Sequence, residues 1–166
     1  MDFEEIRRVA ITVLFSDDVL FERLVLKGGN ALRLVYRMST RSSLDIDVSI
    51  KNDFEDIEDV RRRLFAALTR HFEESGLVAF DMTFDPKPSI PAENERRGGC
   101  QLFFKLIERE KLAKLGGNQE KIRRNAFVVG PAQQRKFCIE ISKYEYREGN
   151  RKSSWTGSRY TSTLLP

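Results

Sequence analysis

Two aspartates at alternate positions of one short stretch, Asp45 and Asp47, are the residues whose types and spacing point most directly to chemistry. The stretch, residues 44–50, alternates strictly between apolar and polar side chains, which predicts a β-strand with one buried face. Both carboxylates then project from the other face, with their Cβ atoms roughly 6–7 Å apart. Aspartate is depleted in strands and like charges repel, so this pair requires a specific reason.

A divalent cation bound between the two carboxylates would remove their repulsion. Oxygen ligands of this kind suit Mg²⁺ or Mn²⁺, and no Cys or His lies nearby in the sequence to favour zinc. Mg²⁺ usually keeps several waters and takes one or two carboxylates together with substrate phosphates. The pair therefore predicts a metal site that acts on a phosphate compound. The alternative is an amphipathic strand whose polar face is simply solvated.

A glycine pair upstream offers a place for the phosphates. Gly28 and Gly29 follow the short apolar stretch 24–27, and Asn30 can cap a helix that runs to Met38. Glycines let backbone N–H groups approach an anion closely, and the N-terminus of the following helix adds partial positive charge. Taken alone, a glycine pair is usually only a turn. Together with the aspartates, it predicts a phosphate-binding turn that faces a metal site.

A third carboxylate lies on another predicted strand. Residues 136–143 alternate in the same way, with Phe137, Ile139 and Ile141 on one face and Glu140 on the other. A glutamate on a half-exposed strand is commonly a surface residue, so this pattern by itself leaves the role of Glu140 open.

The remaining pattern indicates the elements that must position these residues. Helices are predicted over residues 3–15, 30–38, 54–74 and 108–115, and strands over residues 24–27, 44–50, 77–85, 100–107 and 136–143. The clearest helix is 54–74, because its apolar residues recur every three or four positions and Gly76 follows as a stop signal. Residues 118–129 give no clear pattern. This order of elements predicts an α/β or α+β domain with a mixed sheet.

Composition places few further limits on function. A chain of 166 residues fits one domain, and its net charge of +4 gives a mild bias towards polyanions such as nucleotides or RNA. Cys100 and Cys138 have no CxxC motif or His cluster beside them, which favours reduced thiols. No apolar run has the length of a membrane-spanning helix and the N-terminus is acidic, so we expect a cytoplasmic protein with no membrane partner.

The residues around the glycine pair and the aspartates resemble a known motif. The stretch LKGGNAL at residues 26–32, Tyr36 and the stretch RSSLDID at residues 41–47 are similar to the first motif of the polymerase-β-like nucleotidyltransferase superfamily. More narrowly, they resemble the AbiEii/AbiGii family of nucleotidyltransferase toxins from bacterial toxin–antitoxin and abortive-infection systems. The stretch FCIEIS at residues 137–142 matches the third acidic position of the superfamily, and residues 98–106 resemble its central strand less specifically.

The resemblance, which covers about residues 24–141, implies a polymerase-β-like nucleotidyltransferase fold with a mixed β-sheet flanked by helices. It implies an NTP-dependent enzyme that transfers a nucleoside monophosphate to a hydroxyl of RNA, such as tRNA, or of a protein, with release of pyrophosphate. Such an enzyme would be a toxin that a partner antitoxin neutralises. The competing interpretation is a catalytically silent nucleotide- or RNA-binding module of the same fold.

The resemblance also implies roles for individual residues. Asp45, Asp47 and Glu140 would bind Mg²⁺ (or Mn²⁺) and act as the catalytic carboxylates. The nucleotide-binding residues that it implies are Gly28, Gly29, Asn30, Ser43 and Lys105. Other basic residues that could neutralise charge on the phosphates are Lys27, Arg41 and Lys143.

Two segments are expected within the chain. Residues 1–143 would form the nucleotidyltransferase domain, and residues 144–166 are a polar tail with no pattern that could bury itself. Members of the family continue into a helical C-terminal region. We therefore expect the tail to begin such a region and the chain to be a fragment of a longer protein.

Overall fold

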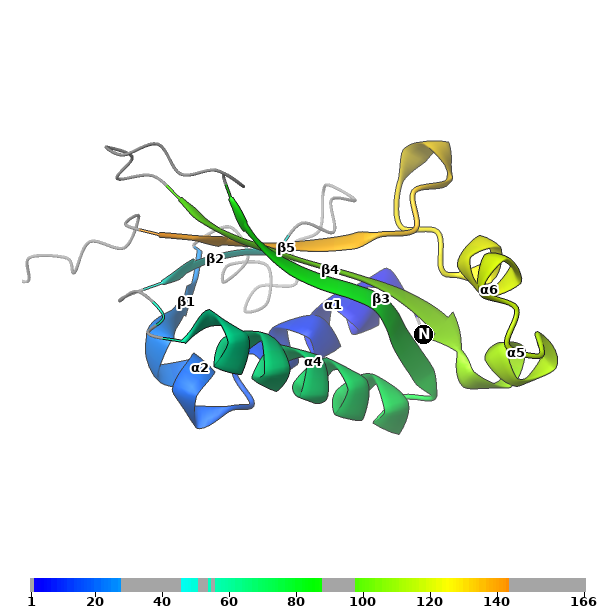
Figure 1. The fold of residues 1–166 in the computed structure, drawn as a ribbon, viewed down its shortest axis with the longest axis horizontal. Helices are drawn as coiled ribbons and strands as arrows, with labels where there is room; N and C mark the ends of the chain where they lie inside the picture. The colour runs from blue at the N-terminus through cyan, green and yellow to red at the C-terminus, as the bar shows by residue number, and fades with distance from the viewer. Residues whose placement is uncertain (1, 28–45, 51–53, 55, 88–97, 144–166) are drawn as a thin grey trace, which may run out of the picture.

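A computed structural model of the chain describes residues 2–27, 46–50, 54, 56–87 and 98–143 (Figure 1). The helices in these residues are α1 (Phe3–Leu14), α2 (Asp18–Arg23), α4 (Ile57–Glu74), α5 (Arg109–Lys114), α6 (Gln119–Asn125) and the short 3₁₀ helix η1 (Pro131–Gln133). The strands are β1 (Leu24–Leu26), β2 (Ile46–Ile50), β3 (Leu77–Lys87), β4 (Gly99–Glu108) and β5 (Phe137–Ser142). All five predicted strands and the predicted helices that became α1, α4 and α5 are confirmed, with small shifts at their ends. The predicted helix 30–38 lies outside the described residues.

Two short helices, α2 and α6, were not predicted by the sequence patterns. The side chain of Asp17 caps α2 by accepting hydrogen bonds from the backbone N–H groups of Val19 and Leu20. Arg63 on α4 donates to the same carboxylate at 2.9 Å and so ties α2 to α4. Asn118 caps α6 in a similar way. Helices of six and seven residues are too short to produce a clear periodic pattern. None of the described helices is long and apolar enough to span a membrane.

The strands of the described residues form one mixed sheet in the order β1-β2-β5-β4-β3. β2 and β5 run parallel, whereas β1 with β2, β5 with β4 and β4 with β3 are antiparallel pairs. The last strand in the chain, β5, therefore lies in the middle of the sheet and joins the N-terminal pair of strands to β4 and β3. The predicted α+β architecture, a mixed sheet flanked by helices, is confirmed.

One face of the sheet packs against α1 and α4 (Figure 1). The predicted apolar stripe of α4 supplies four buried side chains, Val60, Leu64, Leu68 and Phe72. Phe72 meets the sheet at Phe104, whose ring lies between those of Phe72 and Phe137 with centroids 5.7 and 5.0 Å away. Because side chains alternate along a strand, burying this face leaves the polar residues of the same strands on the other face.

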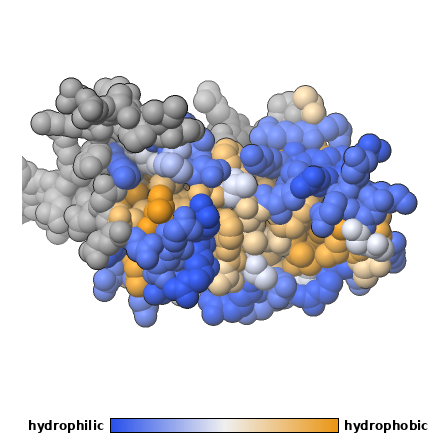
Figure 2. All heavy atoms as spheres, in the orientation of Figure 1, coloured by the Kyte–Doolittle hydropathy of each residue, from blue (hydrophilic) through white to orange (hydrophobic). Residues whose placement is uncertain are grey.

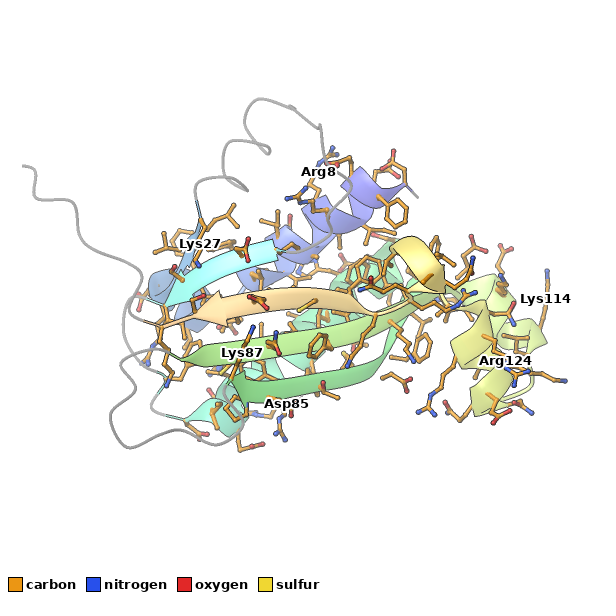
Figure 3. All side chains as sticks on the ribbon, turned by 90° about the horizontal axis from the view of Figure 1, so that it is seen from above. Arg8, Lys27, Asp85, Lys87, Lys114 and Arg124 are labelled. Carbon is orange, nitrogen blue, oxygen red and sulfur yellow. The ribbon has the colours of Figure 1, made fainter. Side chains whose placement is uncertain are left out.

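The opposite face of the sheet, which we call the open face, carries these polar side chains (Figure 3). The alternation is clearest in β5, where Phe137, Ile139 and Ile141 are buried and Cys138, Glu140 and Ser142 are half-buried. The predicted orientation of this strand is therefore confirmed, and Glu140 lies on the face away from α1 and α4.

The edge strand β3 continues two residues past its predicted end. Pro86 begins a proline-containing stretch, which predicts that the strand stops at residue 85. In the structure, Pro86 is paired with Cys100 and Lys87 with Gly99. Proline has no N–H group to donate, but an edge strand tolerates it because one side of the strand needs no partner. The extension brings Lys87 into the sheet.

Close contact between β4 and β5 requires a glycine at residue 99. A Cβ atom added to Gly99 would lie 2.1 Å from the backbone oxygen of Ile141, far inside van der Waals contact. A Cβ atom added to Gly98 would lie no closer than 3.4 Å to the backbone oxygen of Lys87, which is an ordinary contact. Only the first of the two glycines in the pair therefore accepts a side chain.

Gly99→Ala should separate β4 from β5 and lower the free energy of unfolding by about 3 kcal/mol, near the upper end for overpacking a tight site. Gly98→Ala is the matched control and should change it by less than about 0.5 kcal/mol. Urea denaturation of the two variants beside the wild type measures the difference. Equal stability of the two variants would contradict the close approach of the strands at Gly99.

Candidate active site

Four polar residues lie in one row across the open face, at the same level of four neighbouring strands. Asp47 on β2 is in register with Glu140 on β5. Glu140 is opposite Gln101 on β4, and Gln101 is opposite Asp85 on β3. Residues in register on neighbouring strands share a face, and the strands lie about 4.8 Å apart. Asp47 and Glu140 are therefore side by side, and we call the four residues the polar row.

The carboxylate of Glu140 is held through one of its oxygens. Oε1 accepts hydrogen bonds from Nε2 of Gln101 at 2.8 Å and from Nζ of Lys87 at 3.0 Å. The hydrogen bond from Lys87 is the main cause that holds the pKa of Glu140 below its usual range, and that from Gln101 adds to it. The side chain is still 39% exposed. A ligand from solvent can therefore reach an ionised carboxylate at neutral pH.

Lys27 and Lys87 lie on opposite sides of β5, the strand that carries Glu140 (Figure 3). Just after β1, Lys27 donates from Nζ to Oγ of Ser142 at 3.1 Å, and its backbone N–H donates to the backbone oxygen of Asp47. Its charge also helps to lower the pKa of Glu140. Lys87 approaches Glu140 from the other side, from β3. Two carboxylates between two ammonium groups suit a phosphate compound that arrives with a divalent cation.

Lys105, predicted to contact the nucleotide, lies elsewhere on the sheet. It follows Gln101 by four residues on β4, which is roughly 13 Å along the strand. Its Nζ donates to Oδ2 of Asp81 at 2.9 Å. Asp81 has a φ of +49° and lies at the irregularity of β3 between Phe80 and Thr83. The structure therefore does not bring Lys105 to the polar row.

Asp81 instead links the sheet to α6. Its carboxylate also accepts hydrogen bonds from Nε and Nη2 of Arg123, at 2.7 and 3.1 Å. The hydrogen bond from Arg123 is the main cause that lowers the pKa of Asp81, and the one from Lys105 acts in the same direction. Because the Asp81 side chain is only 21% exposed, these two cations stabilise a charge that is largely removed from water.

Six candidate site residues lie outside the described residues: Gly28, Gly29, Asn30, Arg41, Ser43 and Asp45. Within the described part of the chain, no group of three or more His, Cys, Asp or Glu side chains could hold a metal ion. Asp47 and Glu140 nevertheless offer adjacent carboxylates, and Mg²⁺ commonly takes one or two carboxylates and completes its shell with water and phosphate. This pair of oxygen donors fits Mg²⁺ or Mn²⁺ better than zinc.

Sequence patterns missed two residues that contact Glu140. Gln101 is a polar residue between Cys100 and Leu102 within a predicted strand, which is the signal that it belongs to the polar face. Lys87 carried no such signal, because Pro86 predicts a loop there. Their contact with Glu140 depends on the order of the strands, which periodicity within one strand does not determine.

A mixed sheet with helices on one face and side-by-side carboxylates on the other is consistent with a nucleotidyltransferase-like fold. The family model described as nucleotidyl transferase AbiEii toxin, type IV toxin–antitoxin system, matches residues 11–138, well over half of the chain. The chain therefore belongs to the AbiEii family of nucleotidyltransferase toxins. A search of curated proteins found no significant match. The family match ends two residues before Glu140. The assignment of Glu140 to the candidate site therefore depends on its register with Asp47 in the sheet.

Asp81→Asn should lower the free energy of unfolding at neutral pH by about 2 kcal/mol, because a charged acceptor loses hydrogen bonds to two cations. Asparagine also tolerates a positive φ, so the backbone should not change. The pKa of Asp81 lies below its ordinary value of 3.8. The ionised carboxyl therefore stabilises the fold above that value, and this stabilisation is lost as the pH falls through the lowered pKa.

The difference in stability between wild type and Asp81→Asn should accordingly shrink as the pH falls below about 4. Urea unfolding of both proteins from neutral pH down to about pH 3 measures it. Asp85→Asn, at an exposed position of the same strand, is the control and should leave the free energy of unfolding at neutral pH close to that of the wild type. A difference that stays constant over the whole range would contradict the role of the ionised Asp81.

Proposed function

We propose that the chain is a Mg²⁺-dependent nucleotidyltransferase that transfers a nucleoside monophosphate from an NTP to a hydroxyl of RNA, such as tRNA, and releases pyrophosphate. The observation that carries this proposal is the in-register pairing of Asp47 with Glu140 on the open face. Membership of the AbiEii family supports the class of reaction, and the pairing supports a shared cation site for two acidic residues that are far apart in the sequence. A protein hydroxyl is the alternative acceptor.

The carboxylates of Asp45, Asp47 and Glu140 would hold the Mg²⁺ ion, and Mn²⁺ could take its place. Asp45 precedes Asp47 by two residues, so the alternation of a strand would give both the same face, beside Glu140. Bound Mg²⁺ would supply positive charge to the triphosphate and lower the pKa of the acceptor hydroxyl. The hydrogen bonds from Lys87 and Gln101 lower the pKa of Glu140, so this carboxylate is ionised at neutral pH.

The phosphates would lie between the glycine turn and the two lysines. The turn residues proposed to hold them, with one further hydroxyl, are Gly28, Gly29, Asn30 and Ser43. Lys27 and Lys87 flank Glu140 and can neutralise phosphate charge. The acceptor oxygen would bond to the α-phosphorus as the bond to the pyrophosphate oxygen breaks, and the acceptor proton would leave to solvent.

A basic surface at the far end of the sheet supports RNA as the acceptor. Residues 109–136 carry eight Lys or Arg and two Glu, and hydrophilic side chains gather where α6 lies (Figure 2). Lys111, Arg124 and Arg135 line a cavity of about 330 Å³ there, beside Phe127. The end of β4 that borders it lies roughly 24 Å along the strand from the polar row. An extended polyanion can contact both places, whereas a nucleotide cannot.

We further propose that the chain acts as the toxin of its system and has an antitoxin as its partner. This proposal follows the description of the family as toxins of type IV toxin–antitoxin systems. Transfer of nucleotides to the 3′ end of an essential RNA would account for toxicity, because the original 3′ hydroxyl is then esterified and reactions that need the natural end can no longer use it.

Asp47→Asn and Glu140→Gln should each lower nucleotide transfer by at least about 100-fold, since each removes a ligand of the cation that offsets phosphate charge. Asp45→Asn should behave alike, and EDTA should abolish transfer by the wild type. Asp85→Asn is the matched control, because Asp85 belongs to the same row but is exposed on the edge strand. The measurement is transfer of label from each α-labelled NTP to total RNA or to protein.

Full transfer by Asp47→Asn or Glu140→Gln would remove that residue from the mechanism. Binding of NTP by the wild type without transfer to any acceptor would favour the alternative of a silent nucleotide-binding module.

Lys111→Ala and Arg124→Ala should each raise the KM for RNA without changing the affinity for NTP, because their charges lie far from the polar row. Each lost phosphate contact should also reduce the slope of log affinity against log salt by about 1. Filter binding of RNA over a range of salt concentrations measures both effects. An unchanged salt dependence in the variant that combines Lys111→Ala with Arg124→Ala would show that RNA does not bind at this basic surface.

A further inference from the structure

Two donors from different strands converge on a single oxygen of Glu140. Nε2 of Gln101 and Nζ of Lys87 both donate to Oε1, at 2.8 and 3.0 Å. The donors come from β4 and β3, whereas Asp47 belongs to β2, on the other side of β5. The hydrogen bonds to Glu140 therefore come from the side opposite to its partner carboxylate.

The two donors differ in ways that give them different tasks. Gln101 is neutral, half-buried and on the neighbouring strand, so its amide can hold the carboxylate in one orientation. Lys87 is charged, and 56% of its side chain is exposed on the edge strand. An exposed ion pair of this kind contributes little to stability. Because Lys87 lies beside two adjacent carboxylates, its charge acts on their electrostatic balance and not mainly on the stability of the fold.

We propose that Lys87 is the counter-ion of Glu140 when no divalent cation is bound, and that it competes with the cation for this carboxylate. Gln101 positions the Glu140 carboxylate both with and without the cation. The proposal rests on the cation site of the proposed function. Without a cation, Asp47 and Glu140 repel each other across neighbouring strands, and the ammonium group offsets one of the two charges. With a cation, the same ammonium group repels it and occupies a ligand oxygen.

The two residues should consequently have opposite effects on cation binding. Lys87→Met removes a positive charge and a competitor, so we expect Mn²⁺ to bind about three- to tenfold more tightly. Gln101→Leu leaves the carboxylate without its neutral donor, so we expect Mn²⁺ to bind about tenfold more weakly. Residues that merely maintained the fold would weaken binding in both variants.

The experiment uses the whole chain and Mn²⁺ alone. The loss of the electron paramagnetic resonance signal of free Mn²⁺ gives the affinity, and the rise in Tm with Mn²⁺ concentration gives it independently. Lys87→Arg keeps the charge and the donor and should bind Mn²⁺ like the wild type. Lys114→Met removes another exposed lysine charge, from α5 at the other end of the sheet, and should also have no effect (Figure 3).

Mn²⁺ affinity that does not rise in Lys87→Met, or does not fall in Gln101→Leu, would overturn the proposal. Because Lys87 is exposed, its variants should fold, so the sign of the Lys87→Met effect decides the matter even if Gln101→Leu is unstable. Asp47→Asn separates this failure from that of the cation site. Unchanged Mn²⁺ affinity in Asp47→Asn would refute the site itself, whereas loss of affinity there with none gained in Lys87→Met refutes only the role of Lys87.

Discussion

The parallel register between β2 and β5 is the constraint on which the candidate site depends. On the core face it pairs Ile46 with Ile139, and on the open face it pairs Asp47 with Glu140. A slip of one residue would move one of the two carboxylates into the apolar layer over α1 and α4, where its charge would be very costly. The hydrophobic core therefore maintains the alignment of the acidic residues, although they lie on the other face of the sheet.

The electrostatic balance of the open face follows from the same arrangement. β5 lies in the middle of the sheet, so Glu140 has a carboxylate on one side and donors from β4 and β3 on the other. The close approach at Gly99 keeps β4 against β5, which lets Gln101 reach Glu140. The same sheet carries a second charged cluster at Asp81, but its role is to attach α6, and with it the basic end of the molecule.

Helices and strands with a clear periodic pattern of apolar residues were predictable from the sequence. Contacts between elements that are far apart in the sequence were not. The alternation of residues 136–143 predicted both the strand and the face of Glu140, because the side-chain period of a strand is a local property. The sequence placed Lys87 in a loop, because Pro86 precedes it and proline is acceptable in a strand only when that strand is at an edge of the sheet. Which strand is at the edge is not visible in the sequence. Lys105 has the right charge, but its position along β4 pairs it with Asp81.

By itself, the sequence determined which residues alternate, and hence that Asp47 and Glu140 each belong to the polar face of a strand; its motif also indicated the family that the match over residues 11–138 established. Only the tertiary structure decided that these two faces coincide, that the two carboxylates lie next to each other, and that Lys87 and Gln101 meet Glu140. The physical reason is that packing of the common core and the register between strands determine which strands become neighbours in a sheet. These strands are far apart in the chain, so the pattern within one strand does not predict its neighbours.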